Sequence, residues 1–230
     1  AKKVYDAILG LKPEEKDAYF LRGSAELELG DYESAKADFD KAISMDPKNY
    51  DRLIEIYEAL EDYGYREVGQ EYLQNVLNTA KQLDAYDSGR IYYYLGDYQK
   101  AYLALEEAKG KGGVDSYLYL GKAYAATGDY NYASSVYSNY LSKQGPDAEI
   151  YNQLGLCELA KKDYQKALEA FQAGKQIEGN SLMQTLSFNE IVAYEYLQDY
   201  QKAAVLLNAY LQNYPDDQAA IREQQFLSTR

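Results

Sequence analysis

The sequence predicts an all-α protein made of repeated helix-turn-helix units, and three observations support this fold class. One is a turn motif that recurs as LGDYESA (29–35), LGDYQKA (95–101), TGDYNYA (127–133), KKDYQKA (161–167) and LQDYQKA (197–203). The second is spacing: the residues before Asp-Tyr, together with Gly64, recur every 32 to 36 residues, which fits two short helices and two turns. The third is that small and large residues return at helical spacing on both sides of each turn.

The first helix of each unit is expected to carry a small residue seven positions before the turn. In four units this residue is Gly23, Gly89, Gly121 and Gly155. A glycine inside a helix costs about 1 kcal/mol relative to alanine. Its return at one helical phase therefore predicts a place where two helices approach too closely for a side chain.

The second helix of each unit carries a small residue followed four positions later by a large one. The small residues are Ala35, Ala101, Ala133, Ala167 and Ala203, and the large ones are Phe39, Leu105, Tyr137, Phe171 and Leu207. Pro47 and Pro215 follow two of these helices, and proline cannot continue a helix. These residues predict an apolar stripe that packs on the first helix.

This pattern of contact glycine, Gly-Asp-Tyr turn, alanine, aromatic residue and closing proline resembles the tetratricopeptide repeat. The resemblance implies a right-handed α-solenoid, or superhelix, whose first helices line a concave groove. We expect a single solenoid domain over residues 1–230, with repeats at 16–48, 50–80, 82–112, 114–146, 148–181 and 184–216. The second repeat is irregular, because Tyr57 stands at the contact-glycine place and Gly69 replaces the alanine; Ile191 holds the glycine place in the sixth.

The two ends of the chain do not form complete repeats. Residues 1–13 have the spacing of a second helix, which predicts a truncated repeat and a natural protein that extends upstream, where any signal or lipid anchor would lie. Residues 217–230 predict a C-terminal capping helix with a polar outer face. High tyrosine and low cysteine content favours an exported bacterial protein, with a cytoplasmic protein as the alternative.

Composition excludes several classes of function. The chain has 37 acidic and 24 basic residues and a net charge of -13, which disfavours nucleic acid and direct membrane contact. It has no histidine and one cysteine, Cys157, so histidine bases, imidazole metal ligands and internal disulfides are excluded.

Motifs for catalysis or cofactor binding are also missing from the sequence. The glycine-rich stretch 108–116 lacks the spacing of a phosphate-binding loop and is expected to be a loop between repeats. Cys157 lies in a predicted helix with no base to activate it, so we expect an inert, half-buried thiol. We therefore predict no enzyme activity, no cofactor and no metal.

A partner is expected to bind at first-helix positions that packing leaves unused. The candidate groove residues are Phe20, Glu28, Asp51, Glu55, Glu58, Tyr86, Asp87, Arg90, Tyr93, Tyr94, Tyr119, Lys122, Asn152, Phe188, Asn189 and Tyr196. The N-terminal half of this set is acidic and aromatic, which favours a protein segment with Lys or Arg and apolar anchors. Some related repeats clamp a peptide carboxylate with basic residues, and the acids here disfavour that mode.

Three other interpretations stay open at this point. In the first interpretation, the acidic residues only keep an open surface soluble and bind no partner. In the second, the protein is a scaffold that self-assembles through its ends. For the isolated chain we expect a monomer or weak self-association. The third is an accessory domain of a larger enzyme. Within the triplet at 92–94, we expect Tyr92 to be buried, with Tyr93 and Tyr94 toward the groove.

Overall fold

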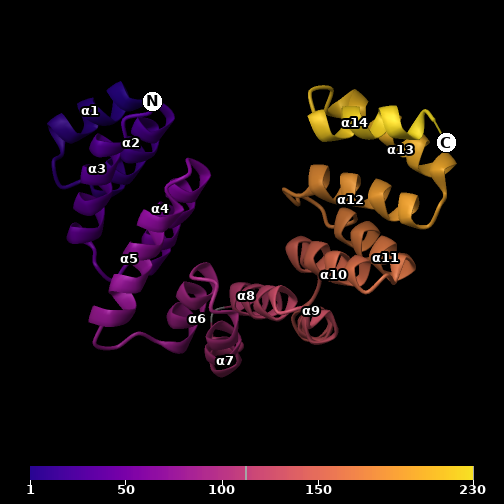
Figure 1. Ribbon diagram of the computed structural model, residues 1–230, viewed down its shortest axis with the longest axis horizontal. Coiled ribbons are helices and arrows are strands. Elements are labelled where there is room, and N and C mark those ends of the chain that lie inside the picture. The colour runs from indigo at the N-terminus through magenta and orange to yellow at the C-terminus, as the bar shows by residue number, and fades with distance from the viewer. Residues whose placement is uncertain (112, 230) are drawn as a thin grey trace. The chain divides into compact units, whose positions relative to one another are not determined.

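The computed structural model describes residues 1–111 and 113–229, and over these residues the protein is entirely helical with fourteen α-helices (Figure 1). They divide into two compact units, Ala1–Asp97 and Tyr98–Arg230. The division falls inside the third predicted repeat, between its two helices. The all-α fold class is therefore confirmed.

The first unit contains six helices that pack in chain order. They are α1 (Lys2–Leu11), α2 (Lys16–Glu28), α3 (Tyr32–Met45), α4 (Tyr50–Asp62), α5 (Arg66–Thr79) and α6 (Ala85–Tyr94). Each contacts the next, and α2 also contacts α4. The first helices of successive repeats are thus neighbours, and the expected helix pairs α2–α3 and α4–α5 are both present.

The second unit contains eight helices with the same sequential packing. They are α7 (Tyr98–Ala108), α8 (Gly113–Ala126), α9 (Tyr130–Gln144), α10 (Ala148–Ala160), α11 (Tyr164–Lys175), α12 (Met183–Tyr196), α13 (Tyr200–Asn213) and α14 (Gln218–Leu227). Contacts also join α8 to α10. The terminal helix α14 contacts α13.

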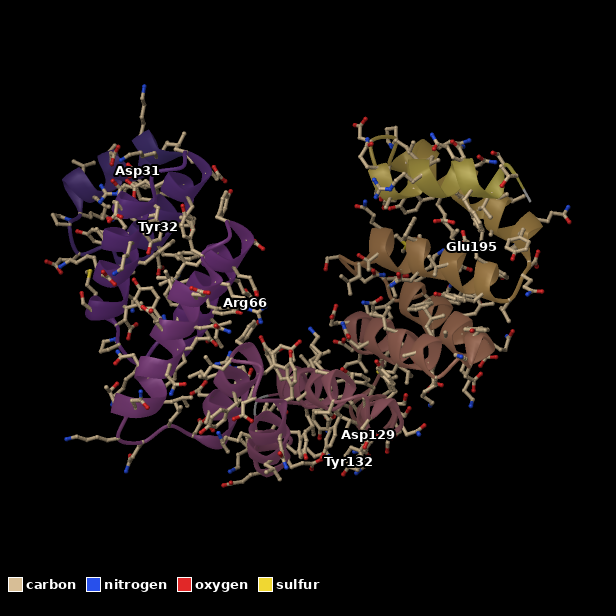
Figure 2. All side chains as sticks on the ribbon, in the orientation of Figure 1. Asp31, Tyr32, Arg66, Asp129, Tyr132 and Glu195 are labelled. Atoms are coloured by element: carbon tan, nitrogen blue, oxygen red, sulfur yellow. The ribbon has the colours of Figure 1, made fainter. Side chains whose placement is uncertain are left out.

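The Gly-Asp-Tyr motif is explained by the geometry of the turn inside each repeat. Gly30 and Gly128 have φ of 76° and 85°, a left-handed conformation that favours glycine and ends the first helix. The next residue caps the second helix: Asp31 accepts a hydrogen bond from the amide of Ser34 (3.2 Å), and Asp129 from that of Tyr132 (3.0 Å). Figure 2 labels both aspartates.

Glycines of the first helices lie against aromatic rings of the second helices. A Cβ atom added to Gly23 would stand 2.7 Å from the ring of Phe39, and one added to Gly155 would stand 2.3 Å from that of Phe171. Gly121 faces Tyr137 in the same way. The predicted close approach of the two helices is confirmed in all three repeats.

The second repeat reaches the same packing with the large and small residues exchanged. Tyr57 on α4 is 1% exposed and occupies the contact-glycine place. Gly69 on α5 leaves room for it, because a Cβ there would lie 2.9 Å from the Tyr57 ring. The irregularity seen in the sequence is therefore a compensated exchange and leaves the helix pair intact.

Two local expectations were wrong. Tyr92 is half-buried, whereas its neighbour Ile91 is fully buried in the core cluster with Tyr57 and Leu73. The stretch 108–116 is only partly a loop, because α8 already begins at Gly113; Gly112 lies outside the described residues. In both places the helix extends or rotates by a small amount that the repeat pattern does not specify.

We predict that Gly155→Ala lowers the free energy of unfolding by about 1–3 kcal/mol, because the new methyl group overlaps the fully buried ring of Phe171. Gly10→Ala on α1 is the matched control, since a Cβ atom added at Gly10 would meet no neighbouring side chain or helix within 4 Å. There the helix propensity of alanine should add about 0.5–1 kcal/mol. Urea unfolding followed by circular dichroism measures both, and equal shifts would contradict the packing assignment.

Candidate functional site

The first helices of the first unit are joined by side-chain contacts across one shared face. Arg52 of α4 binds Asp17 of α2 with an Nη2 to Oδ1 distance of 2.9 Å. Asp51 of α4 binds Arg90 of α6 at 2.5 Å. Three of these residues, Asp17, Asp51 and Arg90, stand at positions that the repeat pattern placed on one face of α2, α4 and α6.

Arg52 covers Phe20 on this face. Its guanidinium carbon lies 4.1 Å from the ring centroid of Phe20, and its Nη1 lies 3.0 Å from Glu55. The Phe20 ring is half-buried and packs 6.1 Å from that of Phe39. Phe20 thus acts as a platform for an arginine as well as a candidate contact.

Arg90 lies beneath the acidic residues. It is 7% exposed, binds Asp51 and Asp87, and has its guanidinium 4.3 Å from the ring centroid of Tyr86. Burial raises the pKa of the Asp87 carboxyl, and the Arg90 hydrogen bond opposes this. Arg90 was predicted to contact a partner, but its burial makes it a residue that positions Asp51 and Asp87.

What remains accessible on α4 is a row of carboxylates that we call the acidic stripe: Asp51, Glu55 and Glu58. They are spaced by four and three residues, so they lie on one side of the helix about one turn apart. The side chain of Asp51 is 75% exposed and that of Glu55 is 49% exposed. Glu58 is exposed and accepts a hydrogen bond from the Tyr94 hydroxyl at 2.5 Å; Glu28 at the end of α2 is also exposed.

Tyr93 and Tyr94 form the aromatic border of this face. Both are half-buried, and their rings meet edge to face with centroids 5.4 Å apart. Tyr94 also lies 5.2 Å from Tyr57 and packs against the buried core. It was expected to face only the groove, so the structure corrects this: Tyr94 joins the core to the surface.

The second unit carries an equivalent face on α8, α10 and α12. Lys122 lies 3.6 Å from Glu149, and its ammonium group is 6.0 Å from the ring centroid of Tyr119. Asn189 of α12 donates a hydrogen bond of 2.8 Å to Asn152 of α10, which is only 5% exposed. The polar groups of this face therefore pair with one another to a large extent.

Two aromatic candidates in the second unit take different positions. Phe188 packs 5.7 Å from Tyr210 beside a buried core cluster, so most of its ring serves packing. Tyr196 is 54% exposed and stacks on Tyr164 of α11 with centroids 4.9 Å apart. Tyr196 thus lies at the turn end of its repeat, next to the second helix of the preceding one.

The sequence prediction missed Arg52. It is the residue that links α2 to α4, covers Phe20 and holds Glu55. A signal was present, because Arg52 and Glu55 have the three-residue spacing of a helical ion pair. Its partner Asp17 lies 35 residues earlier in the sequence, so no local rule indicates this contact.

The only thiol is poorly suited to chemistry. Cys157 is 3% exposed, and burial raises its pKa to about 12. Residues 1–111 and 113–229 hold no group of three or more metal-ligating side chains. Within the same residues, no helix combines the length and apolar character needed to cross a bilayer.

Comparison with known proteins gives one family. Profiles of the tetratricopeptide repeat match residues 16–49, 118–181 and 188–217. The structure resembles pilF of Pseudomonas aeruginosa, at 18% identity and a TM-score of 0.55 over 94% of this chain and 97% of that one. It also resembles TTC0263 of Thermus thermophilus, at 15% identity and a TM-score of 0.58 over 94% and 100%.

A third similar structure is YrrB, described as a repeat protein of this type with an unusual peptide-binding site. It shares 18% identity and a TM-score of 0.53 over 98% of this chain and 100% of that one. At these identities the similarity shows the fold. No curated protein matches the sequence.

We predict that Cys157 in the folded protein reacts with a thiol reagent at pH 8 at least about a hundredfold more slowly than in denaturant, because burial keeps it protonated and covered. The same chain in 6–8 M urea provides the fully reactive reference. Absorbance of the released reagent gives both rates. Comparable rates in the two conditions would show that the thiol is accessible in the native state.

Proposed function

This chain belongs to the tetratricopeptide repeat family, and we propose that it is a non-catalytic interaction module that binds a partner segment with Lys or Arg residues and apolar anchors. Members of this family generally mediate contacts between proteins. The peptide-binding site described for YrrB, which has a similar fold, supports a peptide as the ligand class. The proposal places the binding surface on the first helices of the first unit.

The observation that carries the proposal is the acidic stripe. The nearby arginines are already engaged, since Arg52 binds Asp17 and Glu55 while Arg90 binds Asp51 and Asp87. The side chains that stay accessible are therefore mainly carboxylates. Such a surface attracts ammonium and guanidinium groups and repels acidic segments.

Charge alone is too weak to hold a partner. An exposed ion pair contributes about 0.2–1 kcal/mol, so three pairs give about 1–3 kcal/mol, whereas micromolar binding needs about 8 kcal/mol. Apolar contacts must supply the rest. Tyr93 and Tyr94 border the acidic residues and are only half-buried, so their rings offer flat contact area for apolar anchors, whereas the ring of Phe20 is already covered by Arg52.

The equivalent face of the second unit is less suited to binding basic residues. Its face pairs Lys122 with Glu149 and Asn152 with Asn189, so few of its charges are left for a partner. We therefore assign the recognition of basic residues to the first unit.

We predict that the double substitution Glu55→Gln and Glu58→Gln weakens binding of a basic, tyrosine- or leucine-containing peptide about five- to tenfold, because two charge contacts are lost. Fluorescence anisotropy with a labelled peptide, taken from a library of basic and acidic sequences, measures this. Raising salt from 50 to 500 mM should weaken the native interaction in the same direction.

The matched control is Glu71→Gln, which removes an exposed carboxylate from α5, the second helix of the same repeat. It should leave the affinity unchanged. Selection of acidic peptides, or an affinity that does not depend on salt, would contradict the proposal. Absence of any peptide preference would instead support the view that the carboxylates only keep the surface soluble.

A second candidate function is self-association through the terminal helices. It is favoured by apolar side chains on the outer side of α1, where Val4 is 61% exposed and Leu11 is 85% exposed. Val4 and Leu11 are seven residues apart, so they lie on one side of α1 and together offer apolar contact area to a second copy.

We predict that self-association at high concentration, if this second function holds, is lost in the Val4→Ser and Leu11→Ser double variant and kept in Leu103→Ser. Leu103 on α7 is equally exposed, at 61%, and provides the matched apolar control. Sedimentation equilibrium measures the association constants. A protein that stays monomeric at all concentrations would leave only the peptide-binding proposal.

A further inference from the structure

Two carboxyl groups lie on the sides of α12 and α14 that pack together. Ile191 of α12 shares a core cluster with Ala220 and Leu227 of α14, Glu195 follows Ile191 by one helical turn, and Glu223 lies between Ala220 and Leu227 on the same side of α14. Glu195 lies on α12 and Glu223 on α14, and Figure 2 labels Glu195 next to the C-terminal helices. The Oε1 atom of Glu195 is buried and has no hydrogen-bond partner among the described residues. Burial of an ionised carboxylate without a partner is costly.

Among the described residues, the fully buried acids are each paired with a basic side chain; Asp38 binds Arg22 at 2.6 Å, and the others bind lysine. Glu26 is 2.8 Å from Lys2, Glu158 is 2.8 Å from Lys161, and Glu190 is 2.5 Å from Lys175. Glu195 instead faces a second acid. Burial first, and then the charge of Glu223, raise the pKa of Glu195 to about 7.

The other charged groups near Glu195 are engaged elsewhere or exposed, so Glu223 is the charged group that acts on Glu195. Tyr210 of α13 donates its hydroxyl hydrogen bond to Asp217, and Lys175 of α11 is held by Glu190. On α14 the remaining charged residue is Arg222, which is exposed. Two carboxyl groups can share a hydrogen bond only when one of them carries the proton.

The attachment of α14 is small enough for such a pair to matter. Only Ala220 and Leu227 of this helix are buried, in a cluster with Ile191, Leu207 and Tyr210. The helix has ten residues, and an isolated helix of that length is marginal in water. Its structure therefore depends on docking.

We propose that Glu195 and Glu223 form a pH-sensitive lock, which holds α14 on α12 and α13 while the two carboxyl groups share a proton and loosens it when both are ionised. Release of α14 would uncover Leu207 and Tyr210. The protein would then present an apolar surface above neutral pH that is covered under mildly acidic conditions. This inference is independent of the peptide-binding proposal.

The direction of the pH effect follows from linkage. The docked state raises the pKa of Glu195 from 4.5 to about 7, so it binds the proton more tightly than the undocked state. The stabilisation is full below pH 4.5 and is lost as the pH rises to about 7. Asp217 acts in the opposite direction, because the hydrogen bond from Tyr210 lowers its pKa and its contribution is lost in strong acid.

Hydrogen exchange of the α14 amides, corrected for the intrinsic rate, tests the lock at pH 5.5 and pH 8.0. We expect the protection of residues 220–227 to fall roughly tenfold at the higher pH. Fluorescence of an apolar dye should rise in parallel. Equal protection of α14 at both pH values would overturn the proposal.

Variants assign the effect to the pair. Glu195→Gln should remove the pH dependence and leave α14 protected at pH 8.0, because it eliminates the buried charge. Glu223→Gln should reduce the pH dependence to less than the native tenfold change, because it removes the repelling charge while Glu195 stays buried. Glu178→Gln, an exposed carboxylate in the segment between α11 and α12, is the matched control and should behave as the native protein. Persistence of the tenfold change in either variant of the pair would also overturn the proposal.

Discussion

The contact between a glycine of the first helix and a buried ring of the second is the constraint on which the rest of the structure depends. The rings of Phe39, Tyr137 and Phe171 fill the volume where a first-helix side chain would stand. Each ring thereby fixes both the distance between the helices and the rotation of the first helix. Because Gly155 is held against Phe171, Asn152 one turn earlier is directed toward Asn189 of the next repeat.

This constraint concerns the summed volume of the contact and not the identity of each residue. In the second repeat, the large side chain is Tyr57 on the first helix and the small one is Gly69 on the second. In the sixth, Ile191 packs with Ala203 and Leu207, so an aliphatic pair replaces glycine and ring. Interiors tolerate such exchanges when the total volume is kept, which explains why two repeats depart from the sequence pattern and still form helix pairs.

Features set by local chemistry could be predicted from the sequence, and features set by distant partners could not. The turn after α2 follows from the left-handed conformation of Gly30 and the cap of Asp31, which neighbouring residues determine. The burial of Arg90 depends on Asp51, 39 residues earlier, and its assignment as a contact residue was therefore incomplete. Adjacent residues on a helix differ by about 100° in direction, so the core position fell on Ile91 and not on Tyr92.

The excess of acid over base explains why these carboxylates have such different environments. With 37 acidic and 24 basic residues, the chain does not have enough lysine and arginine to pair every acid. The buried acids Glu26, Glu158 and Glu190 each take one lysine, because an unpaired buried charge is the most costly arrangement. The acids without a lysine must then lie in water, as the exposed Glu55 and Glu58 do beside Arg52 and Tyr94, or lower their cost by retaining a proton. Glu195 lies opposite Glu223 at a half-buried position, so the second arrangement is the one that its surroundings favour.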